Sequence, residues 1–214
     1  MNNKKDPKDN FSVALGLFDY INPACYSVTS ICLLINMYNK MNTTLYVFYI
    51  LGVITSLIFG FTIPTVKLLV GLGKFEFKMP VNLVFYVNSG ILLSSISVFC
   101  HINKFNLFVY FTILVLSIIA LFFIYRKVKK FNTIAVLTGF IGYLLMYIAL
   151  ISLAVNLDLV RCIVLYGVAV CFFVFLVILG ITANLKDARV HWVIETCNVL
   201  CQFFVALSTV LLFI

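Results

Sequence analysis

The sequence contains few charged residues: only 10% of its 214 residues are Asp, Glu, Lys or Arg, whereas 64% are hydrophobic. Soluble domains carry roughly 25% charged residues, so this chain has too few to cover a surface that faces water. A mean hydropathy of +1.17 also excludes a disordered protein. The cysteines number seven, an odd count, and nearly all lie in apolar stretches, which excludes a small disulfide scaffold. An integral membrane protein remains.

Long stretches without a charged residue predict the membrane spans. A helix needs about 20 apolar residues to cross the ~30 Å hydrocarbon layer, and these stretches do not alternate as the strands of a membrane barrel do. We therefore expect an all-α polytopic integral membrane helix bundle of seven transmembrane helices, with six as the alternative count. The predicted spans are 12–37, 45–66, 81–100, 107–125, 133–156, 162–182 and 190–214.

The distribution of Lys and Arg predicts the orientation of the bundle. With a cytoplasmic N-terminus, the outer side holds only Lys40, Lys104 and Arg161, and every other Lys and Arg lies on the inner side. Because cytoplasmic loops carry the excess of positive charge, we expect the N-terminus in the cytoplasm and the C-terminus outside. Residues 1–10 are predicted to form a disordered cytoplasmic tail, and residues 11–214 a single transmembrane domain. The lipid bilayer is the expected partner, and nucleic acid is not.

Polar residues of the last span fall on one face of the predicted helix. His191, Glu195, Asn198, Gln202 and Thr209 follow one another at steps of 4, 3, 4 and 7 residues, which keeps them within about 60° of one another. Polar groups within a membrane usually face the bundle interior. Two interpretations are open. The stripe lines a path for a small molecule or an ion, or it hydrogen-bonds neighbouring helices and has a structural role.

The first span carries a second polar cluster, which includes Asp19, Asn22, Pro23 and Tyr26. Pro23 removes a backbone donor and frees the carbonyl one turn back, and transporters commonly bind substrates or ions at broken helices. A plain proline kink, or a short interfacial helix over 11–21 that precedes the true span, is the alternative interpretation.

The two end helices predict a polar vestibule that opens to the cytoplasm. Asp19 and Glu195 both lie in the inner third of their spans, and Lys67 ends the second span at a similar depth, where it would neutralise one of them. The candidate path for the substrate or ion therefore comprises the following residues: Asp19, Asn22, Pro23, Tyr26, His191, Glu195, Asn198 and Gln202.

Small residues recur at helical spacing in three spans and predict close packing between helices. The three sets are Gly52, Ser56 and Gly60; Gly90, Ser94 and Ser97; and Ala135, Gly139, Gly142 and Ala149. These faces would serve a homo-oligomer as well as the bundle. The fourth span is almost wholly apolar, so we expect it to face lipid.

Enzyme motifs are absent from the sequence. It contains no G-x-S-x-G, no H-E-x-x-H, no phosphate-binding loop and no dinucleotide-binding fingerprint. It contains no C-x-x-C, and its two His are far apart, so we expect no metal site. We therefore expect a protein without a cofactor that is not an enzyme.

The stretch ALGLFDYINPAC, residues 14–25, resembles the opening helix of the LysE-type exporter superfamily, in which an acid is followed by Asn-Pro. That superfamily includes GAP/Sap-like and CcdA/DsbD-like membrane proteins. Residues 51–53 and 188–198 are also similar, and the matched parts cover about a third of the chain. The resemblance implies an exporter of a small solute or lipid precursor in a cell membrane, with the bacterial inner membrane as the expected location.

Two alternatives to export stay open. CcdA/DsbD-like proteins carry electrons through thiols, and this function would use Cys25 together with Cys162 or Cys171. In those carriers a Cys directly follows the Pro, whereas here Ala24 stands between Pro23 and Cys25. The other alternative is a membrane subunit or sensor that transports nothing.

Overall fold

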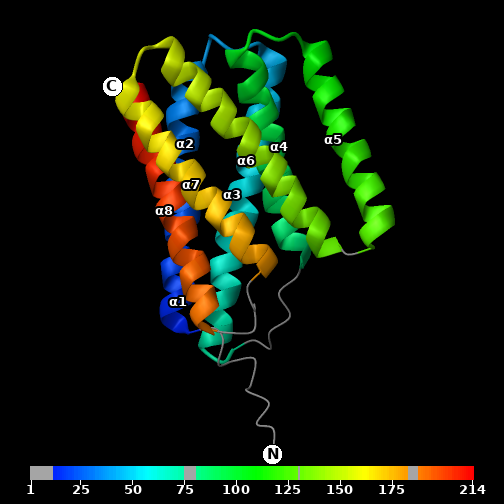
Figure 1. Ribbon diagram of the computed structural model, residues 1–214, viewed down its shortest axis with the longest axis vertical. Helices are drawn as coiled ribbons and strands as arrows, with labels where there is room; N and C mark the ends of the chain where they lie inside the picture. Colours follow the sequence, from blue (N-terminus) through cyan, green and yellow to red (C-terminus); the bar gives the residue numbers. More distant parts are fainter. Residues whose placement is uncertain (1–11, 75–80, 130, 183–187) are drawn as a thin grey trace, which may run out of the picture.

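The computed structural model describes residues 12–74, 81–129, 131–182 and 188–214, and within them all regular structure is helical. The predicted tail over 1–10 lies outside the described residues. Successive long helices run in opposite directions, and α1 and α2 ascend together from the lower end in Figure 1. The helices are α1 (Val13–Asp19), α2 (Ile21–Met37), α3 (Thr43–Gly71), α4 (Val81–Ile102), α5 (Leu107–Val128), α6 (Phe131–Asn156), α7 (Val160–Thr182) and α8 (Ala188–Leu212).

Six helices of the described chain, α3 to α8, are long and apolar enough to cross a membrane. This finding confirms the prediction of an all-helical polytopic membrane bundle. α2 has 17 residues, fewer than the roughly 20 that a span needs. It follows α1 after a single intervening residue, Tyr20, so that α1 and α2 together cover the first predicted span.

The predicted break in the first helix occurs at Tyr20, three residues before Pro23. Pro23 stands in the first turn of α2, where a missing amide hydrogen breaks no helical hydrogen bond. The carbonyl one turn back from Pro23 belongs to Asp19, the last residue of α1. The break therefore ends one helix at an acid and begins the next with Asn22 and Pro23.

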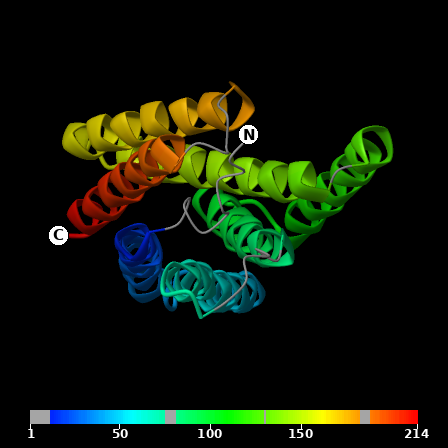
Figure 2. The same ribbon diagram turned by 90° about the horizontal axis from the view of Figure 1, so that it is seen from below.

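α4 lies at the centre of the bundle and packs closely on α3 and α6 through small residues. A Cβ atom placed on Gly52 of α3 would lie 2.6 Å from the Gly90 carbonyl oxygen of α4. A Cβ on Gly142 of α6 would lie 2.9 Å from the Leu92 backbone nitrogen of α4. Figure 2 shows α4 and α6 between the α1–α3 group and α7. The predicted small-residue faces are therefore occupied inside the bundle.

Substitution of Gly52 by Ala should destabilise the protein by about 2 kcal/mol, because the new methyl group meets backbone atoms that cannot turn away. The measurement is thermal unfolding of the purified protein in detergent. Gly167 of α7 is the matched control, because a Cβ there meets nothing within 4 Å. Gly167→Ala should leave stability unchanged or raise it by up to about 1 kcal/mol. Equal effects at the two positions would contradict this account of the α3–α4 crossing.

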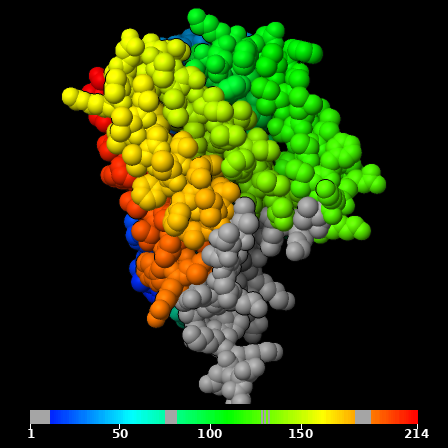
Figure 3. All heavy atoms as spheres, in the orientation of Figure 1, coloured from blue at the N-terminus to red at the C-terminus, as the bar shows by residue number. Residues whose placement is uncertain are grey.

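α5 and α7 lie at the periphery and present apolar side chains outward. Figure 3 shows α7 and α5 forming much of one face of the molecule, with α6 between them. Phe108, Leu116 and Phe123 of α5 and Val164 of α7 are exposed. Helices that face lipid keep such side chains outside, because lipid tails are as apolar as the side chains. The peripheral position of α5 agrees with the prediction that the fourth span faces lipid.

In the upper half of the bundle, as Figure 1 is drawn, buried apolar side chains of several helices form one cluster. Leu33, Tyr49, Ile96, Leu150 and Tyr166, which come from five helices, are almost completely buried in one cluster. The Tyr49 hydroxyl donates a hydrogen bond to the Ser30 carbonyl at 2.9 Å. This half therefore contains buried hydroxyl groups that link helices.

Candidate functional site

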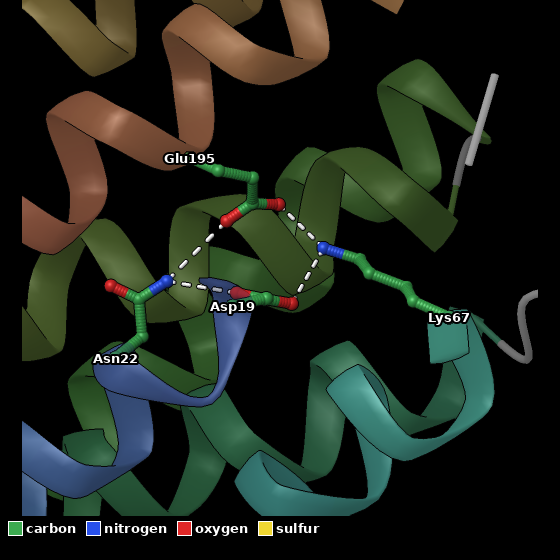
Figure 4. Close-up of polar contacts among 4 residues, drawn as sticks. All are labelled: Asp19, Asn22, Lys67 and Glu195. Atoms are coloured by element: carbon green, nitrogen blue, oxygen red, sulfur yellow. Dashed lines mark hydrogen bonds and ion pairs between the residues drawn. The ribbon is translucent and has the colours of Figure 1, made fainter. Parts of the chain in front are cut away.

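Four polar side chains from four helices meet near the lower end of the bundle (Figure 4). The Lys67 ammonium of α3 lies 2.7 Å from Asp19 Oδ2 at the end of α1 and 2.5 Å from Glu195 Oε1 of α8. Asn22 of α2 donates from Nδ2 to Asp19 Oδ1 at 2.8 Å and to Glu195 Oε2 at 3.3 Å. Each of the four residues, taken as a whole, is at most 8% exposed. We call these four residues the charge cluster.

The hydrogen bonds of the charge cluster form a closed ring. Each of the four carboxylate oxygens accepts one hydrogen bond, two from Lys67 and two from Asn22. This pattern determines the orientation of the Asn22 amide, since its oxygen would repel both carboxylates if the group were turned over. The Asn22 oxygen Oδ1 consequently points away from the acids. It is buried and accepts no hydrogen bond from the described part of the chain.

Residues on both sides of the break at Tyr20 belong to the charge cluster. Asp19 and Asn22 belong to different helices although they are three residues apart, and both turn toward Lys67 and Glu195. The sequence predicted that Lys67 neutralises one of the two acids, and in the structure Lys67 forms an ion pair with both.

A cavity of about 330 Å³ begins at the charge cluster and extends between α2, α3, α4, α6 and α8. Its wall combines polar side chains with the apolar side chains of α3 and α4 and two tyrosine rings. The lining residues are Asp19, Asn22, Pro23, Tyr26, Ser56, Gly60, Ile63, Lys67, Val84, Val87, Asn88, Ile91, Tyr143, Glu195, Asn198 and Gln202. Cavities of a few hundred Å³ are large enough for small-molecule ligands.

Polar contacts between helices hold the cavity wall in place. Tyr26 and Ser94 join α2 to α4 through their hydroxyl groups, 3.2 Å apart. Ser56 donates to the Val87 carbonyl across the α3–α4 crossing at 3.1 Å. Asn88 donates to the Ala135 carbonyl of α6 at 2.7 Å. Three of the walls are therefore linked to α4, which is central in the fold.

The cavity gathers all but one of the residues predicted to form the path. Asp19, Asn22, Pro23 and Tyr26 reach it from the first span, and Glu195, Asn198 and Gln202 reach it from the last. His191 does not belong to the lining, although it lies one turn before Glu195 on α8 and is half-buried. The two polar stripes of the sequence thus face one another across a single space.

The polar stripe of α8 divides into two parts with different surroundings. Glu195, Asn198 and Gln202 line the cavity. Thr209 lies beyond the cavity, where its hydroxyl is 3.0 Å from the Tyr166 hydroxyl of α7 and donates to the Val205 carbonyl. The upper part of the stripe therefore hydrogen-bonds a neighbouring helix, as the structural interpretation predicts. The lower part of the stripe borders the cavity.

Several residues of the wall were not among those predicted, chiefly on α3, α4 and α6. Tyr143 follows Gly142, and this part of α6 approaches α4 closely. Gly60 of α3 stands one turn before Pro64, which lacks the amide hydrogen that would bond the Gly60 carbonyl. The proline inside the second predicted span was the available signal for this part of the wall.

The predicted cysteines are not gathered at one place. All seven cysteines are free thiols. Cys25 lies near the start of α2, at the lower end in Figure 1, whereas Cys162 lies in the first turn of α7, at the upper end. Cys171 is exposed on the outer helix α7.

The site is a buried set of ionisable groups on the wall of a cavity. No group of three His, Cys, Asp or Glu side chains within the described ranges is arranged to hold a metal ion. Two carboxylates and an ammonium group at the wall of a cavity can exchange protons or bind charged solutes. No protein-family model matches the chain, and neither the curated proteins nor the solved structures include one with detectable similarity to it.

Proposed function

We propose that this protein is a multi-pass membrane transporter that exports a small solute through the cavity bordered by the charge cluster. The observation that carries the proposal is the coincidence of two features: a cavity of about 330 Å³ and a buried set of three charged side chains on its wall. Ionisable residues within membrane segments are costly and mark substrate or ion paths.

A purely structural role explains the charge cluster less well. A buried ion pair loses its hydration, and apolar residues of similar volume often stabilise a protein as well or better. Such a role would also favour a filled interior, as in the upper half of the bundle. Here the charged groups border an unfilled space, and Asn22 keeps an unpaired oxygen beside it. An unfilled space with a few polar groups on its wall is typical of a site that binds a small molecule.

The proposed topology has seven crossings, with α1 and α2 together forming the first. The described basic residues support a cytoplasmic position for the lower side in Figure 1. Lys74, Arg126, Lys127, Lys129 and Arg189 stand at the lower ends of helices, whereas Lys40, Lys104 and Arg161 stand at the upper ends. The positive-inside rule then assigns a cytoplasmic N-terminus and an outer C-terminus. A bacterial inner membrane is the proposed location, in line with the resemblance to LysE-type exporters.

Alternating access needs a barrier on one side of the binding site. The densely packed cluster around Tyr49, Ile96 and Tyr166 would provide this barrier on the outer side. The break at Tyr20 and the proline at position 64 allow α2 and α3 to bend beside the site. In this proposal the structure is the inward-facing conformation, which is closed on its outer side. The change to the outward-facing conformation moves α1, α2 and α3.

Neutral replacement of either acid should abolish transport. Glu195→Gln and Asp19→Asn keep the size of each side chain and remove its charge, and we expect flux to fall at least tenfold. The assay is solute counterflow in proteoliposomes that contain the purified protein, with a panel of neutral, anionic and cationic solutes.

Asp158→Asn is the matched control for this experiment. Asp158 is an exposed acid in the turn before α7, with a left-handed φ of 54° that Asn also adopts readily. Its replacement should leave flux unchanged. If no solute in the panel moves with the natural sequence, or if folded Glu195→Gln and Asp19→Asn proteins transport normally, the proposed function is wrong, and a subunit or sensor takes its place.

A further inference from the structure

The charges on the cavity wall do not balance. Two carboxylates, Asp19 and Glu195, share one ammonium group, Lys67, and no further Lys or Arg belongs to the described lining. Lys67 donates to both acids at once, so the two acids share this cation. With all three groups ionised, the cluster carries one excess negative charge beside the cavity. In a medium of low dielectric constant such a charge attracts a cation strongly.

Asn22 supplies a second, independent indication of a ligand. Only 8% of the residue is exposed, it belongs to the cavity wall, and its Oδ1 is buried without a hydrogen-bond donor from the described residues. An unpaired buried acceptor is unfavourable, because it has lost its hydrogen bonds to water. Because Nδ2 donates to Asp19 and Glu195, the amide group cannot rotate to bring its oxygen to another donor without losing these two hydrogen bonds. A lining residue next to both acids is thus left with an unsatisfied acceptor among the described residues.

The remainder of the cavity wall is suited to the apolar part of an organic ligand. Val84, Val87 and Ile91 of α4 present an apolar surface, and Tyr26 and Tyr143 present aromatic rings. Aromatic rings attract ammonium groups through their faces. A bare metal cation would instead need several oxygen ligands around it, and the Val84, Val87 and Ile91 side chains of the wall offer none.

We propose that the cavity binds a small primary organic ammonium ion with an apolar tail, which makes such a compound the exported solute. This inference depends on the proposed function for the step of transport, but the binding itself does not. The ammonium group lies in the cavity beside Asp19 and Glu195. The tail extends along Val87 and Ile91 toward Tyr143. The added positive charge balances the cluster.

The test is binding of 3-methylbutylammonium to the purified full chain, measured by calorimetry in detergent at constant ionic strength. Two compounds of nearly the same shape serve as comparators: 3-methylbutan-1-ol, which is neutral, and 3-methylbutanoate, which is an anion. Sodium and potassium ions alone are measured as well. We expect the ammonium compound to bind at least tenfold more tightly than each comparator and than either metal ion.

Two variants locate the bound compound. Glu195→Gln removes the excess negative charge, so that the ammonium compound should bind at least tenfold more weakly while the protein stays folded. Asp19→Asn gives the same charge change from a different helix and repeats the test if one variant fails to fold. Asp158→Asn, which lies in the turn before α7, should bind the compound as the natural sequence does.

The outcomes separate this inference from the proposed function. Tighter binding of the alcohol, the carboxylate or a metal ion, or binding that ignores both acid variants, overturns the inference. If a neutral or anionic solute then shows flux that depends on Glu195, the transporter stands without an ammonium substrate. If the ammonium compound binds as expected but no solute crosses the membrane, the inference stands and the transporter is wrong.

Discussion

Replacement of Lys67 by Met should destabilise the folded protein by about 3–5 kcal/mol, because it leaves two buried carboxylates without their shared cation. The Lys67 ammonium lies within 2.7 Å of an oxygen of each acid. Met is similar in length and unbranched, so the variant removes the charge with little change in volume. Thermal unfolding in detergent measures stability, and counterflow in proteoliposomes measures transport, which should be lost.

A variant with all three charges removed separates electrostatics from packing. Asp19→Asn, Lys67→Met and Glu195→Gln together leave no unpaired charge, so most of the lost stability should return. Transport should stay absent in this variant, since no ionisable group of the cluster is left. A Lys67→Met protein as stable as the natural sequence would show that Asp19 and Glu195 do not depend on Lys67. Normal transport by the triple variant would show that the cluster has only a structural role.

A Leu side chain in place of Gly60 should block transport without unfolding the protein. Gly60 lines the cavity, and a Cβ at this position meets only the Pro23 Cβ, at an ordinary contact distance of 3.6 Å. The rest of the Leu side chain would extend into space that a solute needs. We expect counterflow to fall at least tenfold, because a bound solute and the added side chain cannot occupy the same volume. Calorimetry should show a matching loss of 3-methylbutylammonium binding.

Gly167→Leu is the matched control for the blocked cavity. Gly167 is half-buried on α7, where a Cβ finds nothing within 4 Å, and it does not belong to the lining. The same substitution there should leave transport and stability unchanged. Equal loss of transport at the two positions would indicate a general effect of a larger side chain. Full transport by Gly60→Leu would place the solute path elsewhere in the bundle.

The helical class and the positions of the spans could be predicted because they depend on properties of single segments. A run of apolar residues without charge has only one way to satisfy its backbone in lipid, and that way is a helix. The six long helices follow the predicted spans closely. The exact break at Tyr20 was less predictable, since Pro23 is compatible with a kink at several neighbouring residues.

The candidate site could be predicted only in part. Asp19, Glu195, Asn198 and Gln202 were found because a costly polar group in a membrane must face the interior. Tyr143 of α6 carries no such signal, since tyrosine is common on many membrane surfaces. The apolar part of the wall on α4 was also out of reach, because valine and isoleucine occur on every face of these helices.

The sequence by itself determined that the chain is a membrane-embedded helical bundle and which faces of the first and last helices are polar. These conclusions need only composition and helical period, both of which are local. The tertiary structure decided that Lys67 pairs with both acids, that no described residue donates to the Asn22 oxygen, and that α4 and α6 complete the cavity. Such facts depend on how helices far apart in the chain cross, and crossings are decided by the joint packing of many side chains.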